Sequence, residues 1–331
     1  MRTSRLLPTA AVALAAAAAL TGCQSSKAAT TANGTPSVKI MVGGIDKVIY
    51  LPAKLTEQLG YFKAENVLLA GQVQGVVGFY DHTVALQTQG KCLTSVVQMS
   101  KAPGEVEMVS TKKAATLTGF SAVKGKKLGV TSPGSSTDFL TRALAVRNGV
   151  KDSDYTTVKA GAGTTFISAL DQGAIDAGMT TDPTVARLVS TGKAKVLVDM
   201  RTEEGSKAAL GGAYPSSSLY MDCAYVQAHK DTVQKLANAF VKTLQWIHAH
   251  SPADIAAKMP ADYAGSDKNL YVKAIGDSKG MFNTDGKMKA EGAQNVLNVL
   301  GQFSPSVKPN KDKVDLTKTY TTEFVDKAPQ A

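Results

Sequence analysis

The stretch 68–99, LLAGQVQGVVGFYDHTVALQTQGKCLTSVVQM, recurs in altered form at 170–200, LDQGAIDAGMTTDPTVARLVSTGKAKVLVDM. In each copy two glycines stand 19 positions apart, namely Gly71 and Gly90, then Gly173 and Gly192. Each copy continues through an apolar strand, an Asp, a helix and a β-branched strand that ends in Met. A strand–helix–strand unit that occurs twice predicts two similar α/β lobes in one chain. Small ligands commonly bind between domains, so we expect a binding cleft between the lobes.

The order of elements along the chain predicts that it crosses between the lobes twice. We assign 37–110 to the first lobe and 111–202 to the second lobe. Residues 203–331 are assigned to the return into the first lobe and to C-terminal helices. Two crossings form a hinge that can close on a ligand.

The N-terminus predicts export. Two arginines precede an apolar run at 10–20 that is too short to span a bilayer permanently, as in a signal peptide. The run ends in Leu-Thr-Gly-Cys, which resembles a bacterial lipobox and implies lipidation of Cys23 and loss of 1–22. An ordinary signal peptide with an incidental Cys is the alternative. Residues 23–36 are rich in Ser, Thr, Ala and Gly and predict a flexible tether. We therefore expect a periplasmic or cell-surface protein that is anchored to the membrane by lipid.

The composition restricts the partners and sites that we expect. The net charge is +10, but the basic residues are scattered and no aromatic-interleaved basic stretch occurs, so nucleic acid is not an expected partner. Apart from Cys23, the chain has only Cys92 and Cys223, and no C-x-x-C metal pattern. These two can form a disulfide after export, and two buried free thiols are the alternative. His248 and His250 face different directions on a predicted helix, so no metal site is predicted.

A serine-rich loop at 132–137, SPGSST, lies between a predicted strand and a predicted helix. Backbone N–H groups are free at the start of a helix and the helix dipole favours negative charge there. The loop therefore predicts a site for a carboxylate, sulfonate or phosphate-like group. A plain helix cap with extra serines is the alternative. Neither a nucleotide-binding Gly-Lys-Ser/Thr loop nor a G-x-S-x-G nucleophile motif is present.

Around this loop the chain resembles a known family. Residues 127–140, KLGVTSPGSSTDFL, are similar to the second-lobe entry of the periplasmic solute-binding proteins of ABC importers. The similarity is to the subgroup that binds sulfonates, nitrate, taurine and thiamine pyrimidine precursors. The helix that begins at 51 and ends in LGYF at 59–62 is also similar to that family. The resemblance covers nearly the whole mature chain. It implies an α/β, type II periplasmic-binding-protein fold, a non-catalytic monomer without a cofactor, and a membrane permease as partner.

The resemblance also implies a pocket lined by four segments. Tyr50 and Tyr80 could stack on a planar ligand, and Asp81 or Asp182 could receive an amine. Each of these aspartates precedes a predicted helix and could cap it instead. No carboxylate–His–nucleophile arrangement is apparent around His82, and no catalytic residue is expected. The expected ligand-binding residues are Gly44, Ile45, Asp46, Tyr50, Tyr80, Asp81, His82, Ser132, Gly134, Ser135, Ser136, Thr137, Thr180, Thr181 and Asp182.

The ligand and the role remain open at this point. The serine-rich helix start favours an anion, such as a sulfonate, nitrate or taurine, whereas the tyrosines suit a pyrimidine-like heterocycle. One alternative role is a tethered sensor or scavenging lipoprotein without its own permease. Another is a thiamine-pyrimidine synthase-like enzyme of the same fold, but that family carries a cysteine-rich motif that this chain lacks.

The first copy of the repeat is preceded by a much shorter segment than the second. Gly149 and Gly173 are 24 positions apart and enclose a predicted strand, loop and helix, whereas Gly60 and Gly71 are only 11 apart. The family normally has a strand in both places. We therefore expect the first lobe to lack its edge strand and the pocket loop above it. The first strand, at 38–42, would then be an exposed edge that favours aggregation, and the pocket would be open on one side.

Overall fold

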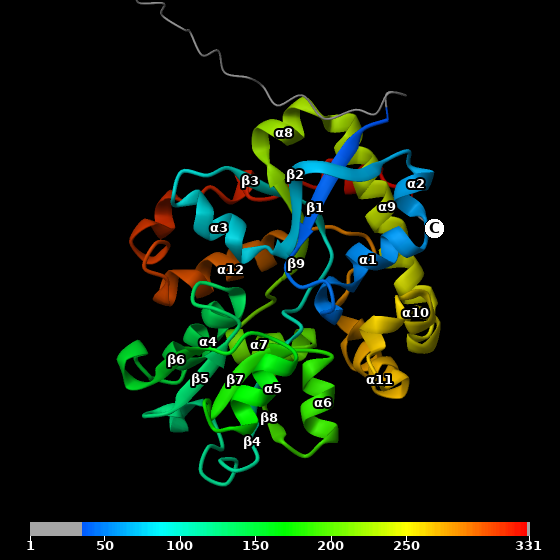
Figure 1. Ribbon diagram of the computed structural model, residues 1–331. Helices are drawn as coiled ribbons and strands as arrows, with labels where there is room; N and C mark the ends of the chain where they lie inside the picture. Colours follow the sequence, from blue (N-terminus) through cyan, green and yellow to red (C-terminus); the bar gives the residue numbers. More distant parts are fainter. Residues whose placement is uncertain (1–34, 330–331) are drawn as a thin grey trace, which may run out of the picture.

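The computed structural model describes residues 35–329 as two lobes, each built on one sheet (Figure 1). The first sheet has the order β1-β2-β9-β3, with β1 Ser37–Val42, β2 Leu68–Phe79, β9 Ser217–Asp222 and β3 Leu93–Gln98. The second has the order β6-β5-β7-β4-β8, with β6 Thr156–Lys159, β5 Lys127–Val130, β7 Ala177–Thr181, β4 Glu105–Ser110 and β8 Ala194–Asp199. The chain passes between the sheets after β3 and again before β9. The predicted two-lobed fold with two crossings is confirmed.

The crossings lie at slightly different positions from those expected. The first was placed at residue 110, but β4 is paired with β7 and β8 in the second sheet, so the chain crosses between β3 and β4. The return was placed at residue 203, but α7, Glu203–Leu210, contacts α4 and β8 of the second lobe. The return therefore follows α7.

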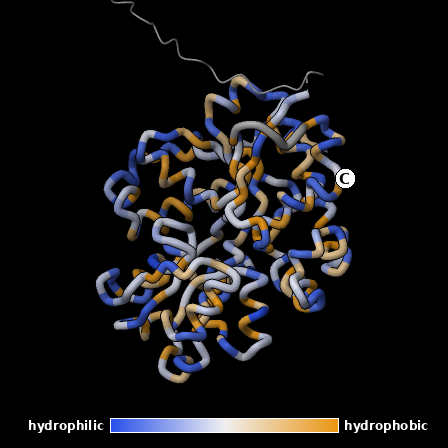
Figure 2. The backbone as a smooth tube through the Cα atoms, in the orientation of Figure 1, coloured by the Kyte–Doolittle hydropathy of each residue, from blue (hydrophilic) through white to orange (hydrophobic). Residues whose placement is uncertain are grey.

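Helices cover both sheets. They are α1 Leu51–Gln58, α2 Tyr61–Ala64, α3 Asp81–Gln87, α4 Ser136–Arg147, α5 Thr164–Asp171, α6 Thr184–Ser190, α8 Cys223–Ala228, α9 Lys230–Ala249, α10 Pro252–Lys258, α11 Lys268–Ser278 and α12 Ala290–Phe303. The longest, α9, packs against α1, α2 and β3 because one apolar stripe, from Val233 to Ile247, faces the first-lobe core. Apolar segments run through the interior of both lobes (Figure 2). Among residues 35–329, no helix has both the length and the apolar character needed to cross a bilayer.

The first sheet lacks the counterpart of β6, as the short spacing predicted. In the second sheet β5 lies between β6 and β7, whereas β1 pairs with β2 alone and forms an edge of its sheet. Gly173 follows helix α5, but its counterpart Gly71 lies inside the long strand β2, so the helix before that glycine is missing too. Eleven residues are too few for a strand, a loop and a helix. The open edge leaves Met41 on β1 56% exposed.

Cys92 and Cys223 form a disulfide, with their Cα atoms 5.5 Å apart. The bond joins the chain just before β3 to the first residue of α8, beside the paired residues Leu93 and Asp222. Of the two alternatives, free thiols and a disulfide, the structure contains the disulfide. The predicted signal peptide, Cys23 and the tether up to residue 34 lie outside the described residues.

Candidate ligand-binding site

A cavity of about 140 Å³ lies between the lobes. Its first-lobe wall consists of Gly43, Lys47, Tyr50, Val76, Gly78, Phe79, His82 and Tyr220, and its second-lobe wall of Glu105, Thr131, Ser135, Ser136 and Thr137. This inter-lobe cavity is called the cleft below. A cavity of this size holds more than a single water and suits a small ligand.

The serine-rich loop enters the cleft at the N-terminus of α4, but two of its hydroxyls are used inside the loop. Ser135 caps α4 by accepting a bond from the Asp138 N–H, and its hydroxyl donates to the Ser132 carbonyl at 2.6 Å. The Thr137 hydroxyl accepts from the Thr131 N–H and lies 2.7 Å from Ser135 Oγ. Because the Ser135 proton is already committed, Thr137 donates to it. These hydroxyls therefore shape the loop rather than point at a ligand.

The free donors of the loop are backbone groups. Ser136 and Thr137 are the first two residues of α4, so their N–H groups have no partner within the helix, and the described part of the chain supplies no other acceptor. Both residues line the cleft. The positive end of the helix dipole adds to the attraction for negative charge, and Lys47 and His82 line the same cavity. The arrangement suits a small anion.

Asp81 joins the two lobes beside the cleft. The Ser136 hydroxyl donates to Asp81 Oδ1 at 2.9 Å from the second lobe, and the Tyr214 hydroxyl donates to Asp81 Oδ2 at 3.0 Å. Burial raises the pKa of Asp81, while His82 and the two hydroxyl donors oppose this rise. Asp81 is the first residue of α3, and its carboxylate also accepts a hydrogen bond from the backbone N–H of His82. Its carboxylate is occupied by protein donors, so it is not free to receive an amine.

The structure brings Asp81, His82 and Ser136 together, although the sequence did not make such an arrangement apparent. His82 Nε2 lies 3.3 Å from Ser136 Oγ, and His82 Nδ1 lies 3.8 Å from Asp81 Oδ1. In a nucleophilic triad the serine gives its proton to the histidine, which the carboxylate holds by a hydrogen bond. Here the Ser136 hydroxyl donates directly to Asp81, and the His82–Asp81 distance is too long for a hydrogen bond. The three residues therefore form a contact between the two lobes and not a nucleophilic triad.

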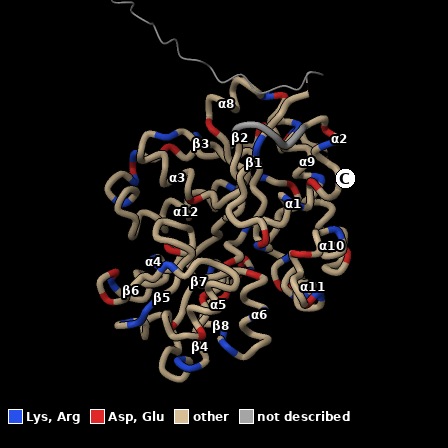
Figure 3. The backbone as a smooth tube through the Cα atoms, in the orientation of Figure 1, with Lys and Arg blue, Asp and Glu red and all other residues tan. Residues whose placement is uncertain are grey.

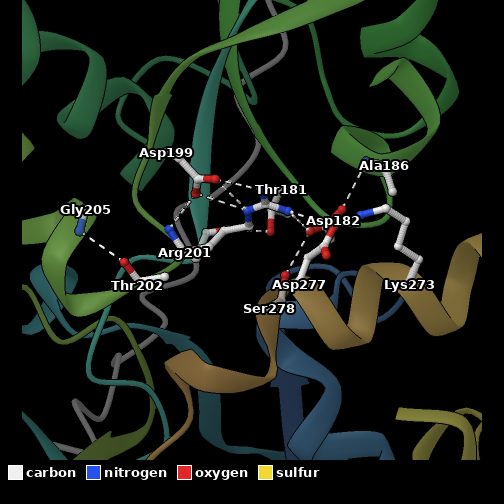
Figure 4. A network of polar contacts seen from close by, with 11 residues as sticks. Thr181, Asp182, Ala186, Asp199, Arg201, Thr202, Gly205, Lys273, Asp277 and Ser278 are labelled. Atoms are coloured by element: carbon white, nitrogen blue, oxygen red, sulfur yellow. Dashed lines mark hydrogen bonds and ion pairs between the residues drawn. The ribbon is translucent and has the colours of Figure 1, made fainter. Parts of the chain in front are cut away.

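Asp182 does not line the cleft but forms a second contact between the lobes (Figure 4). Its Oδ1 accepts from the Ala186 N–H and so caps α6, while Oδ2 accepts from the Ser278 hydroxyl at 2.8 Å and from Arg201 at 3.1 Å. Its carbonyl accepts from the Val48 N–H of the first lobe. Burial raises the pKa of Asp182 even though the Arg201 charge opposes the rise.

Only some of the predicted residues lie in the cleft. Of the fifteen, Tyr50, His82, Ser135, Ser136 and Thr137 line the cleft. Tyr80 is buried with its hydroxyl against Thr319 and its ring beside Tyr320, in the first-lobe core. Thr181 donates to the Gly104 carbonyl at the first crossing. Ile45 borders a groove at the β1 edge, and Asp46 borders a cavity beside α6 and α11. The other predicted residues that do not line the cleft are Gly44, Ser132, Gly134 and Thr180.

Two tyrosines can cover the cleft because glycines lie beneath them. A side chain at Gly78 on β2 would begin only 2.9 Å from the hydroxyl of Tyr220, and one at Gly43 would begin 2.9 Å from the hydroxyl of Tyr50. The absence of a Cβ at both positions makes room for the tyrosine side chains. Tyr220 was missed in the sequence because β9 is far from the motifs along the chain.

Glu105 is the other residue that sequence reasoning missed. It lines the cleft, is 2% exposed, and its Oε2 has no hydrogen-bond partner among the described residues. Burial raises the pKa of its carboxyl to about 7, with Lys47 opposing and Asp81 adding to the rise. Glu107, two positions along β4, is also buried and both its carboxyl oxygens are unpartnered. Two acids in one buried strand, EVEMVS, are an unusual pattern that could have indicated a site.

We expect Glu105→Gln to stabilise the protein at alkaline pH. Between the ordinary pKa of 4.5 and the folded value of about 7, the folded chain holds a proton at Glu105 that the unfolded chain releases. The free energy of unfolding therefore falls as pH rises through this range, by up to about 3 kcal/mol, and glutamine removes this loss. Thermal unfolding of the wild-type and Glu105→Gln proteins at pH 4.5 and pH 8 measures the stability difference between them. The gain should appear only at pH 8, and exposed Glu291→Gln, the control, should show none. Equal effects of Glu105→Gln at both pH values would contradict the expectation.

The charged surface and the possible metal ligands add no further site. Lys and Arg positions are spread along the backbone of both lobes (Figure 3). In the described ranges no group of three or more His, Cys, Asp or Glu is arranged to hold a metal ion.

Comparison with known proteins agrees with this geometry. The model of the family described as "NMT1/THI5 like" matches residues 51–254. A solved structure from Bordetella bronchiseptica RB50 is 34% identical, with a TM-score of 0.82 over 88% of this chain and 96% of that chain. No curated protein sequence matches significantly.

Two more distant structures share the fold. The alkanesulfonate-binding protein SsuA from Xanthomonas axonopodis pv. citri, bound to MOPS, is 16% identical with a TM-score of 0.68, covering 89% of this chain and 99% of that one. The periplasmic nitrate-binding protein NrtA from Synechocystis PCC 6803 is 13% identical with a TM-score of 0.62, covering 87% and 86%. The chain belongs to the NMT1/THI5-like family and has the two-lobed fold of the periplasmic binding proteins.

Proposed function

We propose that this protein is the exported solute-binding component of an ABC importer. It captures a small anionic nutrient between its lobes and delivers it to a membrane permease. The observation that carries the proposal is the pair of unpartnered N–H groups of Ser136 and Thr137, which line the cleft at the start of α4. Proteins of the same fold bind a sulfonate-containing compound or nitrate, which supports the ligand class.

Capture is coupled to contacts between the lobes. The anion accepts hydrogen bonds from the second lobe at α4, while Lys47 and His82 approach it from the first lobe. The Ser136–Asp81 hydrogen bond forms across the same boundary, so a ligand that favours the closed arrangement also favours this bond. The protein binds its ligand without catalysis, because the Ser136 hydroxyl donates to Asp81 and not to His82, so Ser136 lacks the proton path of a nucleophile.

The proposed location is outside the cytoplasm, with lipid on Cys23 as the anchor. The lipobox-like sequence is one support, and the Cys92–Cys223 disulfide is a second, independent one. Cys92 is exposed, and an exposed disulfide persists in an oxidising compartment but not in a reducing one.

Two variants at one position test the anion site. Ser136 is the first residue of α4, where proline fits, and the preceding Ser135 has the extended backbone that a following proline needs. Ser136→Pro removes both the hydroxyl and the N–H, whereas the matched control Ser136→Ala removes the hydroxyl alone. A hydrogen bond to a charged group contributes about 2 kcal/mol, so we expect Ser136→Pro to bind an anionic probe at least about tenfold more weakly than Ser136→Ala.

The measurement is titration calorimetry with a probe chosen by a thermal-shift screen. The screen contains ethanesulfonate, taurine, nitrate and an aminopyrimidine, because a bound ligand raises the melting temperature by mass action. Equal affinities of the proline and alanine variants would remove the N–H of Ser136 from the site. A shift with the pyrimidine alone would replace the anion by a heterocycle.

A further inference from the structure

The cleft contains one acidic side chain with a carboxyl oxygen that no described residue partners. Glu105 lies at the start of β4, directly after the first crossing, and lines the cleft with a side chain that is 2% exposed. Its Oε2 has no hydrogen-bond partner among the described residues, and the positive charge that acts on the carboxyl is that of Lys47. A buried carboxyl without partners disfavours folding, and such groups gather at functional sites.

The two aspartates that were expected to receive an amine are already occupied. Asp81 accepts from Ser136 and Tyr214, and Asp182 from Arg201 and Ser278. Glu105 is therefore the acid of the cleft that has acceptor capacity to spare.

The surroundings of Glu105 suit a positively charged partner. Tyr50 and Tyr220 line the same cavity, and aromatic faces together with a carboxylate attract an ammonium group. The N–H groups of Ser136 and Thr137 lie in the same cleft and attract negative charge. The cleft thus combines an anion-binding element with an unsatisfied carboxyl.

We propose that Glu105 determines specificity, and that the cleft selects small zwitterions in which an amine accompanies the anionic group, as in an aminosulfonate. This inference rests on the proposed function and narrows its ligand class. The anionic group binds at the start of α4, and the amine supplies the hydrogen bonds that Glu105 lacks.

Three sulfonates of nearly equal size distinguish the contribution of the amine to affinity from that of the sulfonate. Taurine has an ammonium group, isethionate has a hydroxyl in its place, and ethanesulfonate has neither. Calorimetric titration of the wild-type protein should give taurine an affinity at least about tenfold higher than that of ethanesulfonate, with isethionate between them. In Glu105→Gln the preference for taurine should fall to about twofold or less. Glu107→Gln is the matched control, because Glu107 is equally buried and unpartnered on the same strand but does not line the cleft. It should keep the wild-type preference.

The pH dependence gives a second readout. Because the carboxyl must be ionised to bind an ammonium group and its pKa in the free protein is about 7, taurine should bind more tightly at pH 8 than at pH 6. The charged or titratable groups that act on Glu105 or are affected by it are Lys47, Tyr50, Asp81 and Glu107. Ethanesulfonate lacks the amine, so the difference between the two probes isolates the contribution of Glu105.

Each outcome decides between the inference and the proposed function. Equal affinities for taurine and ethanesulfonate in the wild-type protein, or a taurine preference that survives in Glu105→Gln, would overturn the inference and leave anion capture standing. Absence of binding by all three sulfonates would overturn both for this ligand class. The comparison of taurine with ethanesulfonate in the wild-type protein needs no variant, so it tests the preference for an amine even if Glu105→Gln folds poorly.

Discussion

Replacement of both cysteines, Cys92→Ala with Cys223→Ala, is expected to lower the free energy of unfolding by up to about 5 kcal/mol. The disulfide closes a loop of 131 positions, so in the chain-entropy model it removes a large part of the freedom of the unfolded chain. It also joins neighbouring strand ends of the first sheet, β3 and β9, next to the paired residues Leu93 and Asp222. Urea denaturation of the wild-type and the double variant, without reductant, measures the difference.

Reductant provides the control for this experiment. Because Cys92 is exposed, a mild thiol should bring the wild-type denaturation midpoint down to that of the double variant and leave the variant unchanged. Coincident wild-type and variant midpoints without reductant would show that the bond contributes nothing. Ligand affinity should stay the same, since neither cysteine lines the cleft.

The second large effect is expected at Arg201. Its guanidinium group binds the fully buried Asp182 and the half-exposed Asp199, and it approaches Asp277 on α11 (Figure 4). Arg201→Met leaves the Asp182 carboxylate without its positive partner. Removing one member of a buried ion pair costs about 3–5 kcal/mol, because the remaining charge stays out of water. Chemical denaturation of the wild-type and Arg201→Met proteins at pH 8 measures this loss.

Two controls separate the buried charge from other causes. Lys273→Met removes an exposed partner of the same Asp277 and should cost less than about 1 kcal/mol. Asp182→Asn combined with Arg201→Met removes both charges and keeps the oxygen that caps α6, so it should recover part of the loss. Without Arg201 the pKa of Asp182 rises further, so Arg201→Met should lose less stability at pH 5 than at pH 8. A double variant no more stable than Arg201→Met would contradict this account.

Much of the fold was predictable because it depends on short-range patterns and on chain length. The two copies of the repeat give β2-α3-β3 and β7-α6-β8, with the glycines Gly90 and Gly192 after the helices. The missing edge strand was predictable from the spacing between Gly60 and Gly71, since the number of residues limits the number of elements. The crossings were displaced by one element each, because the sequence does not say which sheet a strand such as β4 joins.

The candidate site was less predictable, because its members come from distant parts of the chain. Ser135, Ser136 and Thr137 were found through the helix-start pattern, which is local. Glu105 and Tyr220 were not, since neither belongs to a motif. The sequence also does not show which hydroxyls are free, because Ser135, Ser136 and Thr137 each carry one and only their partners in the fold distinguish them.

The sequence predicts two α/β lobes, two crossings, a shortened first sheet and a helix N-terminus suited to an anion. These follow from periodicity, spacing and residue type, which act over one or two elements. The contacts of Asp81 with Ser136, 55 positions away, and with Tyr214, 133 positions away, arise only in the folded chain. Those contacts occupy the carboxylate of Asp81, which was an expected amine acceptor. Glu105, in contrast, lines the cleft with a carboxyl oxygen that no described residue partners. A side chain's remaining hydrogen-bonding capacity depends on what the folded chain places beside it, and the sequence does not encode that locally.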